Sequence, residues 1–431
     1  MLIKVLQLLA SLSLLVIIHE FGHYIFARIF KCRVEKFYLF FDWKFSLLKK
    51  KIGDTEYGVG WIPLGGYVKI SGMVDESLDK EQLAQPIQPW EFRAKPAWQR
   101  LLIIVAGVVM NLVLAFAIYV GVAFAWGEQY IKTQDVKQGF EFSTTAQSIG
   151  FQTGDKVIEV GGRAVENSSE VAREILLSDQ RDVLIERGSE RLMIHVTESD
   201  VAKLLSNASS PFMNLRYPFI VADSAANGMM AGDSLTAVGD EQLLFADEFR
   251  ARFALHKGDS IDVSLVRQGQ TIQQRVAVDT AGRIGVHIAA HNIYPVTVNQ
   301  YSIFEAIPRG AQKAIEQVSS YFDQLNLIFS PKTEAYKGVG GFIAMGKIFP
   351  DQWNWYAFWN ITALLSIMLA VLNIMPIPGL DGGHLLFIVY EMIAGRAPSQ
   401  KFMEAAQYVG FILILGLVLV VNASDVVKLF S

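Results

Sequence analysis

The sequence predicts a polytopic membrane protein with four transmembrane α-helices, a membrane-associated β-hairpin and two α/β domains inserted between the second and third helices. Hydrophobic residues make up 52% and charged residues 19% of the 431 residues, so the chain is more apolar and less charged than an ordinary soluble protein. The apolar excess is concentrated in four blocks, and an internal repeat separates the second block from the third. These observations argue against a purely soluble protein.

The charge balance and the single cysteine exclude several classes of function. The chain has 38 basic and 42 acidic residues, whereas proteins that bind nucleic-acid phosphates carry an excess of basic charge. We therefore expect no nucleic acid partner. Cys32 alone cannot form an internal disulfide framework, a four-cysteine zinc site or a CxxC redox motif. A metal site would have to use His, Asp and Glu, and nothing in the sequence implies an oligomer.

Four stretches are long enough to cross a bilayer, which takes about 20 apolar residues per helix. We expect the first helix in residues 1–30, the second in 101–126, the third in 351–390 and the fourth in 405–424, with a cytoplasmic loop at 391–404. A cluster of Trp and Tyr opens the third stretch, as is typical of helices anchored at the membrane interface. A cleaved signal peptide is the alternative for the first stretch, but no small-residue cleavage site follows it.

Basic residues beside the helices predict the orientation, because cytoplasmic loops are rich in Lys and Arg. They follow the first helix and precede the second and fourth, at Arg28, Lys31, Arg33, Lys36, Lys95, Arg100, Arg396 and Lys401. This pattern places residues 31–100 on the cytoplasmic side. Both termini and the long segment 127–350 then lie on the opposite side.

The long segment contains two copies of one pattern. A Gly-x-x-x-Gly-Asp motif at 150–155 returns at 228–233, and each copy leads into a short apolar stretch that ends at a glycine with the same offset. A polar helical stretch and two alternating strands joined by a Gly turn follow each copy. The pattern resembles a tandem pair of PDZ domains, which we expect at 127–220 and 221–298. Two generic small mixed domains are the alternative.

A connector at 299–350 follows the repeats. Its apolar residues from Ile303 to Phe329 have helical spacing, which predicts an amphipathic helix broken near Pro308. Such a helix could pack on the repeats or lie on the membrane surface. The sequence does not decide between these placements.

The first apolar stretch carries an H-E-F-G-H motif from His19 to His23. On a helix the two histidines lie one turn apart on one face, so that both imidazoles can reach one zinc ion. A charged group at the centre of a membrane helix costs about 2.5–3.5 kcal/mol, which makes Glu20 a functional candidate. The alternative is that these residues mark the polar cytoplasmic end of the helix.

A catalytic zinc ion has three protein ligands and one open position, so a third ligand is needed. Asp381 is the best candidate, because two prolines and three glycines interrupt the third apolar stretch around it. Irregular backbone at membrane depth occurs only where it is buried in protein or lines a wet cavity. The predicted orientation brings both half-sites to the same depth. His384 is a competing ligand, and an Asp-Gly turn without a ligand role is the alternative.

These residues suffice for peptide hydrolysis. Zinc held by His19, His23 and Asp381 would polarise the scissile carbonyl, while Glu20 would take a proton from the attacking water and later deliver it to the leaving amine. The substrate has to be extended at such a site, because a helix occupies its own carbonyls. The stretch from Tyr57 to Ile70 alternates apolar residues around a Gly-Gly break, and we expect it to form a β-hairpin that dips into the membrane and offers an edge to the substrate. An ordinary cytoplasmic hairpin is the alternative.

Four segments together resemble the site-2 protease family of intramembrane zinc metalloproteases. They are His19–His23, Trp61–Lys69, Gly107–Asn111 and Asn373–Gly383. The resemblance covers essentially the whole chain, although the glycines at 340–341 lack the proline that commonly follows them in the family.

The resemblance also implies roles for individual residues. It implies that Asn373 binds the substrate backbone or the developing oxyanion near the zinc ion. Asn111 would either act similarly or only bond between helices. The resemblance supports substrate contacts for Gly65, Gly66 and Tyr67.

The expected function is that of a zinc endopeptidase in the bacterial inner membrane, with periplasmic termini and PDZ domains. By resemblance, the substrates would be single-pass membrane proteins, namely anti-sigma factors already trimmed on the periplasmic side, and remnant signal peptides. The PDZ pair would gate their access. A catalytically inactive, membrane-anchored PDZ scaffold is the first alternative. A zinc transporter is the second, and the absence of a further set of intramembrane charges disfavours it.

Overall fold

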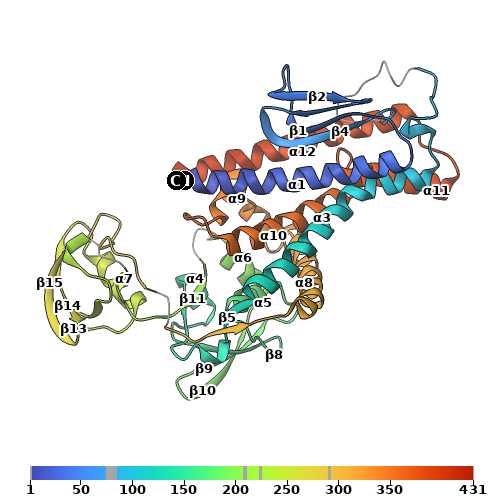
Figure 1. Ribbon diagram of the computed structural model, residues 1–431. Helices are drawn as coiled ribbons and strands as arrows, with labels where there is room; N and C mark the ends of the chain where they lie inside the picture. The colour runs from blue at the N-terminus through green and yellow to red at the C-terminus, as the bar shows by residue number, and fades with distance from the viewer. Residues whose placement is uncertain (1, 74–84, 207–210, 223–225, 290–292, 431) are drawn as a thin grey trace. The chain divides into compact units, whose positions relative to one another are not determined.

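The computed structural model describes residues 2–73, 85–206, 211–222, 226–289 and 293–430, so residues 74–84 of the predicted cytoplasmic region lie outside it. The chain divides into two compact units (Figure 1). The first unit contains residues 1–127, 300–323 and 339–431, and the second contains 128–299 and 324–338.

Four helices of the first unit are long and apolar enough to cross a membrane, as predicted. They are α1 (Leu2–Ile29), α3 (Ala97–Trp126), α10 (Trp355–Ile374) and α12 (Gln400–Phe430). The α3 helix packs against both α1 and α10, and the three lie side by side in Figure 1. We conclude that the chain is a multi-pass membrane protein.

The third apolar stretch is broken where the prolines and glycines predict a break. The α10 helix ends at Ile374, and α11 (Asp381–Ala394) begins after an irregular segment. Gly379 in this segment has φ +95°, a conformation that favours glycine. The break puts Asp381 at the first position of a new helix. The direction of its side chain is therefore not set by the helical repeat of α10.

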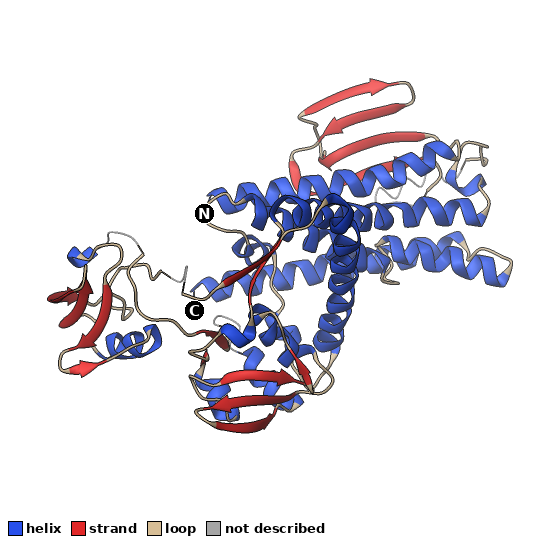
Figure 2. Cartoon of the chain, turned by 60° about the horizontal axis from the view of Figure 1, so that its bottom comes forward, coloured by secondary structure: helices blue, strands red, loops and turns tan. Residues whose placement is uncertain are grey.

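The first unit also contains a four-stranded sheet, seen beside the helices in Figure 2. Its strands are β1 (Val34–Phe41), β2 (Leu48–Ile52), β3 (Thr55–Val59) and β4 (Ile62–Ile70), in the order β2-β3-β1-β4. Strand β3 is parallel to β1, and β4 is antiparallel to β1 on its other side. The predicted hairpin over residues 57–70 is therefore wrong in its pairing.

The crossing between β3 and β4 explains the error. The N–H groups of Gly60 and Trp61 donate to carbonyls of β1, those of Leu39 and Phe41, so the chain passes over the end of β1 instead of folding back on β3. The alternation of apolar residues identified the strands β3 and β4 correctly. It does not show which strands are paired, and here β1 lies between the two.

In the second unit, the two copies of the sequence repeat share one topology. The first copy contains α4 (Thr144–Ile149), β7 (Lys156–Val160), β8 (Arg163–Ala164), α5 (Val171–Leu177), β9 (Asp182–Arg187) and β10 (Glu190–His195). The second contains β12 (Ser234–Val238), β13 (Glu241–Gln242), α7 (Ala246–Leu255), β14 (Ser260–Arg267) and β15 (Gln270–Ala277). The sheet orders, β10-β9-β7-β8 and β13-β12-β14-β15, place equivalent strands side by side. The assignment of these domains to the PDZ fold stays a prediction.

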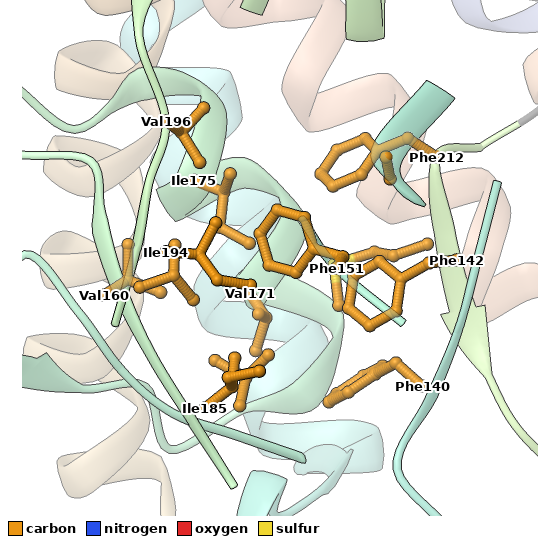
Figure 3. Packing of buried hydrophobic residues seen from close by; sticks show 14 of the residues in the cluster. Phe140, Phe142, Phe151, Val160, Val171, Ile175, Ile185, Ile194, Val196 and Phe212 are labelled. Atoms are coloured by element: carbon orange, nitrogen blue, oxygen red, sulfur yellow. The ribbon is translucent and has the colours of Figure 1, made fainter. Parts of the chain in front are cut away.

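Each copy has its own hydrophobic core. Figure 3 shows the first, in which Phe142 stacks on Phe151 with ring centroids 4.7 Å apart and Val171 and Ile175 of α5 pack near them. Phe249 and Phe253 of α7 occupy the second core together with Phe219. Two separate cores indicate that each copy is stabilised largely by its own burial of apolar surface.

Short elements complete both units. Strand β5 (Glu128–Ile131) pairs with β16 (Val296–Asn299), and β6 (Phe140–Phe142) pairs with β11 (Met213–Leu215). The short helices are α6 (Glu198–Ser206) and α9 (Phe342–Ile348). The connector helix α8 (Ile303–Phe329) continues through Pro308, so the predicted break is absent. Pro308 lies in the second turn, where the missing N–H deprives only the carbonyl of Phe304 of its helical partner.

The aspartate of each Gly-Asp motif forms a buried ion pair with an arginine of its own copy. Both oxygens of Asp155 accept bonds from Arg187 at 2.7 and 2.8 Å, and those of Asp233 accept bonds from Arg267 at 2.8 and 2.6 Å. Hydrogen bonds from Arg267 lower the pKa of Asp233 below its usual value. A lowered folded-state pKa contributes stability at neutral pH that is lost as the pH falls through the acidic range.

We predict that Arg267→Ala destabilises the second repeat by about 3 kcal/mol, because it leaves the buried carboxylate of Asp233 without its cation. Hydrogen exchange of the amides in β12 and β14 should then become faster in the full-length protein. Arg275→Ala on β15 is the matched control, because Arg275 is exposed. Equal exchange in both variants would show that the ion pair does not stabilise this domain.

Candidate active site

Helix α1 presents two buried histidines toward α3. His19 and His23 lie one turn apart, and their Nε2 atoms are 3.2 Å from each other. The rings meet edge to face, with centroids 4.8 Å apart. The i and i+4 spacing in the sequence thus produces the predicted pair on one helix face.

The carboxylate of Asp381 joins the two histidines. Its Oδ2 atom lies 3.1 Å from Nε2 of His19 and 3.3 Å from Nε2 of His23. Among the described residues, these three side chains form a group that could hold a metal ion. The break between α10 and α11 therefore places a third donor atom beside the pair on α1.

The spacing of the three atoms fits zinc. Tetrahedral zinc binds nitrogen and oxygen at about 2.0–2.1 Å, which puts neighbouring ligand atoms about 3.3 Å apart. The three distances between donor atoms, 3.1, 3.2 and 3.3 Å, are close to that value. Oδ2 of Asp381 is also buried and lacks a hydrogen-bond partner among the described residues. A cation between the three atoms would satisfy that oxygen.

A backbone carbonyl of α3 orients His23. Nδ1 of His23 lies 2.8 Å from the carbonyl oxygen of Ile103, which can only accept a hydrogen bond. Nδ1 therefore carries the proton, and Nε2 keeps its lone pair for a metal. Such partners behind a ligand raise its basicity and fix its orientation.

Glu20 lies between the histidines in sequence and beside β4 in space. Its carboxylate accepts a hydrogen bond from the backbone N–H of Val68 in β4 and lies close enough to interact electrostatically with His19, His23 and Asp381. Glu20 therefore has both strand β4 and the candidate metal ligands as neighbours. This position suits a base that acts on a water molecule at the site.

Close contact between α1 and α3 depends on glycines. A Cβ atom on Gly107 of α3 would overlap Nε2 of His23 and lie 2.7 Å from Cε1 of His19. A Cβ on Gly22 of α1 would in turn overlap the carbonyl of Ala106. Gly107 belongs to the segment Gly107–Asn111 of the family resemblance, and its lack of a side chain lets the two histidines lie against α3.

The two asparagines expected near the site are both there. Nδ2 of Asn373, near the end of α10, lies 3.3 Å from Nε2 of His19. Asn111 of α3 is fully buried, and its Nδ2 lies 3.2 Å from Nδ1 of His19. Asn373 thus faces the metal-binding side of the ring, whereas Asn111 contacts the opposite nitrogen.

The structure places the three residues predicted at the substrate strand in β4. Gly66 lies against α1, where a Cβ would come 2.6 Å from Cγ1 of Val16. The side chain of Tyr67 is bound within the sheet, because its hydroxyl donates to Oδ1 of Asp42 at 2.8 Å. Gly65 also belongs to β4. Any contact of these residues with substrate would therefore rest mainly on their backbone.

The competing ligand His384 makes a different contact. Its Nε2 lies 3.1 Å from Nε2 of Gln407 in α12, and Oε1 of Gln407 accepts the N–H of Gly379 at 2.6 Å. Gln407 thereby connects α12 to the segment that carries Asp381. Sequence reasoning missed Gln407, although a glutamine within an otherwise apolar block was the available signal.

The sequence model of peptidase family M50 matches residues 7–417. This chain belongs to peptidase family M50, the site-2 protease family. A protein of Rickettsia conorii that bears the name "putative zinc metalloprotease" is 26% identical over 436 residues, covering 100% of both chains. One from Neisseria meningitidis is 27% identical over 99% of both chains, and metalloprotease MmpA of Caulobacter vibrioides is 27% identical over 98% of this chain and 95% of its own.

Membership of family M50 supports zinc-dependent proteolysis as the activity of this membrane protein. The relatives are similar to this chain along its whole length, so the similarity includes both the membrane helices and the inserted repeats.

We predict that Gly107→Ala lowers the affinity for zinc by about 10-fold or more, because the added methyl group displaces the rings of His19 and His23 from the positions in which both reach the metal. Zinc content after dialysis measures the effect. Gly121→Ala is the matched control on the same helix, because a Cβ there would meet nothing within 4 Å. Full zinc content in Gly107→Ala would show that the close packing of α3 is not needed for the site.

Proposed function

We propose that this M50 member is an intramembrane endopeptidase that cuts the transmembrane segments of single-pass proteins in the bacterial inner membrane. The observation that carries the proposal is the position of the donor atoms. His19 and His23 lie on a helix long and apolar enough to span a membrane, and Asp381 follows another such helix after a short break. A peptide cut there would itself have to enter the membrane.

His19, His23 and Asp381 would hold the zinc ion. When bound, zinc supplies Lewis-acid polarisation of the scissile carbonyl and makes a water molecule more acidic. Glu20 takes the proton of the attacking water and delivers it to the leaving amine. The amide N–H of Asn373, which lies 3.3 Å from Nε2 of His19, would donate to the substrate backbone or to the developing oxyanion.

An extended substrate could bind at the edge of the sheet. Strand β4 is one of the two edge strands of the sheet, and the N–H of Val68 bonds to Glu20. A peptide that adds to β4 would be held by backbone hydrogen bonds close to the general base. The strand thus supports the proposal that substrates unwind before cleavage, since helical carbonyls are already bonded.

The proposed substrate class rests on the family resemblance. We propose trimmed anti-sigma factors and remnant signal peptides as substrates, with the repeated domains on the periplasmic side as a filter that refuses untrimmed proteins. The position of the repeats between α3 and α10 in the sequence supports this proposal. A membrane-anchored scaffold is the second candidate, in which the repeats bind partners and the metal site has no role.

We predict that purified protein cuts a trimmed single-pass substrate within its membrane segment, and that Glu20→Gln does not. The variant keeps the shape of the side chain but removes the base, so the cleavage rate should fall by at least about 100-fold. Zinc content of both proteins is measured together with cleavage.

The comparison separates the candidate functions. Cleavage by wild type and none by a zinc-loaded Glu20→Gln protein agrees with the proposal. Equal cleavage by both proteins would exclude Glu20 as the base, and failure of zinc-loaded wild type to cut favours the scaffold.

The filter can be tested by a deletion that the fold suggests. Ile131 of β5 and Val296 of β16 are directly paired, so a two-residue Asn-Gly turn can replace residues 132–295. We expect the shortened protein to cut untrimmed substrate that the wild type refuses. The control is the same deletion with Glu20→Gln, which should cut nothing. If the shortened protein still refuses untrimmed substrate while it cuts the trimmed form, the filter lies elsewhere.

A further inference from the structure

One polar atom beside the candidate zinc site has no partner. The side chain of Asn111 is 0% exposed, and its Oδ1 is buried without a hydrogen bond among the described residues. The other end of the same amide, Nδ2, lies 3.2 Å from Nδ1 of His19.

The tautomer of His19 decides whether the oxygen or the nitrogen of the Asn111 amide lies beside Nδ1 of His19. A neutral imidazole carries its proton on one nitrogen only. If Nδ2 of Asn111 donated to Nδ1 of His19, the proton would lie on Nε2, which is the atom that faces His23 and Asp381. That tautomer cannot bind a metal through Nε2.

A half-turn of the Asn111 amide removes the conflict. Oxygen and nitrogen of a side-chain amide exchange places in such a turn and are assigned from their hydrogen bonds. Oδ1 would then accept the Nδ1–H of His19, and Nε2 would keep its lone pair. His23 already has the equivalent arrangement, with Nδ1 bonded to the carbonyl of Ile103 on the same helix.

We propose that Asn111 is a positioning residue whose side-chain carbonyl fixes His19 in the metal-binding tautomer. Helix α3 then provides an acceptor for each histidine, one from a side chain and one from the backbone. The hydroxyl of Ser366 in α10 donates to the backbone carbonyl of Asn111 at 2.8 Å, so it contacts the main chain of this residue and not the side chain that bonds His19. The proposal rests on the zinc site of the proposed function and adds Asn111 as a residue that orients one of its ligands.

The test compares variants that keep or remove the acceptor. Asn111→Asp keeps an oxygen that can accept from Nδ1–H, whereas Asn111→Leu has a similar volume and no acceptor. Ser366→Ala is the matched control, because it removes a buried hydrogen bond at the same helix contact without touching a histidine. Zinc affinity is measured by chelator competition on the full-length protein in detergent, together with the absorption spectrum of the cobalt-substituted protein.

We expect Asn111→Leu to weaken zinc binding about 10- to 100-fold and to alter the cobalt spectrum. Asn111→Asp and Ser366→Ala should stay within about threefold of wild type. Wild-type affinity and spectrum in Asn111→Leu would overturn the proposal, as would a lower melting temperature of the metal-free protein with unchanged affinity. If Asn111→Leu does not fold, Asn111→Ala replaces it in the same comparison.

The measurement does not depend on cleavage. A protein that binds zinc normally but cuts no substrate would contradict the proposed function, while the affinities of the variants would still decide the role of Asn111.

Discussion

The first unit depends on the approach of α1 to α3, because that contact lets polar ligands exist inside an apolar helix assembly. The rings of His19 and His23 lie against Gly107, and the Nδ1 atom of each ring contacts a group on α3. With larger residues at the contact, the helices would separate, and each imidazole would lose the bond that orients it. Burying a polar group in a membrane costs free energy unless the group is paired. The histidines can therefore serve as metal ligands only if α1 and α3 pack closely enough to pair them.

The break after α10 makes it possible to place the third ligand, the carboxylate of Asp381, among apolar helices. A carboxylate is hardest to place in a continuous membrane helix, whereas the start of a new helix offers backbone N–H groups and a positive dipole end. Asp381 occupies that first position in α11. Gln407 then bonds the irregular segment to α12, so the fourth membrane helix supports the third ligand without contributing one.

Sequence patterns predicted the parts of the site whose signal is local. Hydropathy located the four helices, the i and i+4 spacing located the histidine pair, and an acid within a proline- and glycine-rich break located Asp381. The partners of these groups carry no such signal, because the acceptor for His23 is the backbone carbonyl of Ile103 and any residue has one. Strand pairing is equally hidden: the order β3-β1-β4 depends on where the chain crosses β1, and alternation alone favoured a hairpin. The sequence also predicted a helix break at Pro308. The helix continues there because Pro308 lies near its start, where few helical hydrogen bonds are lost.

The central claim is that two imidazoles and one carboxylate hold a zinc ion within the membrane helices. X-ray absorption at the zinc edge of the purified full-length protein tests it most directly, because it reports the number and type of ligand atoms. We predict two imidazole nitrogens and oxygen ligands at about 2.0–2.2 Å, with no sulfur. A first shell with three imidazoles would assign the third position to His384 instead of Asp381, and a protein without stoichiometric zinc would contradict the account.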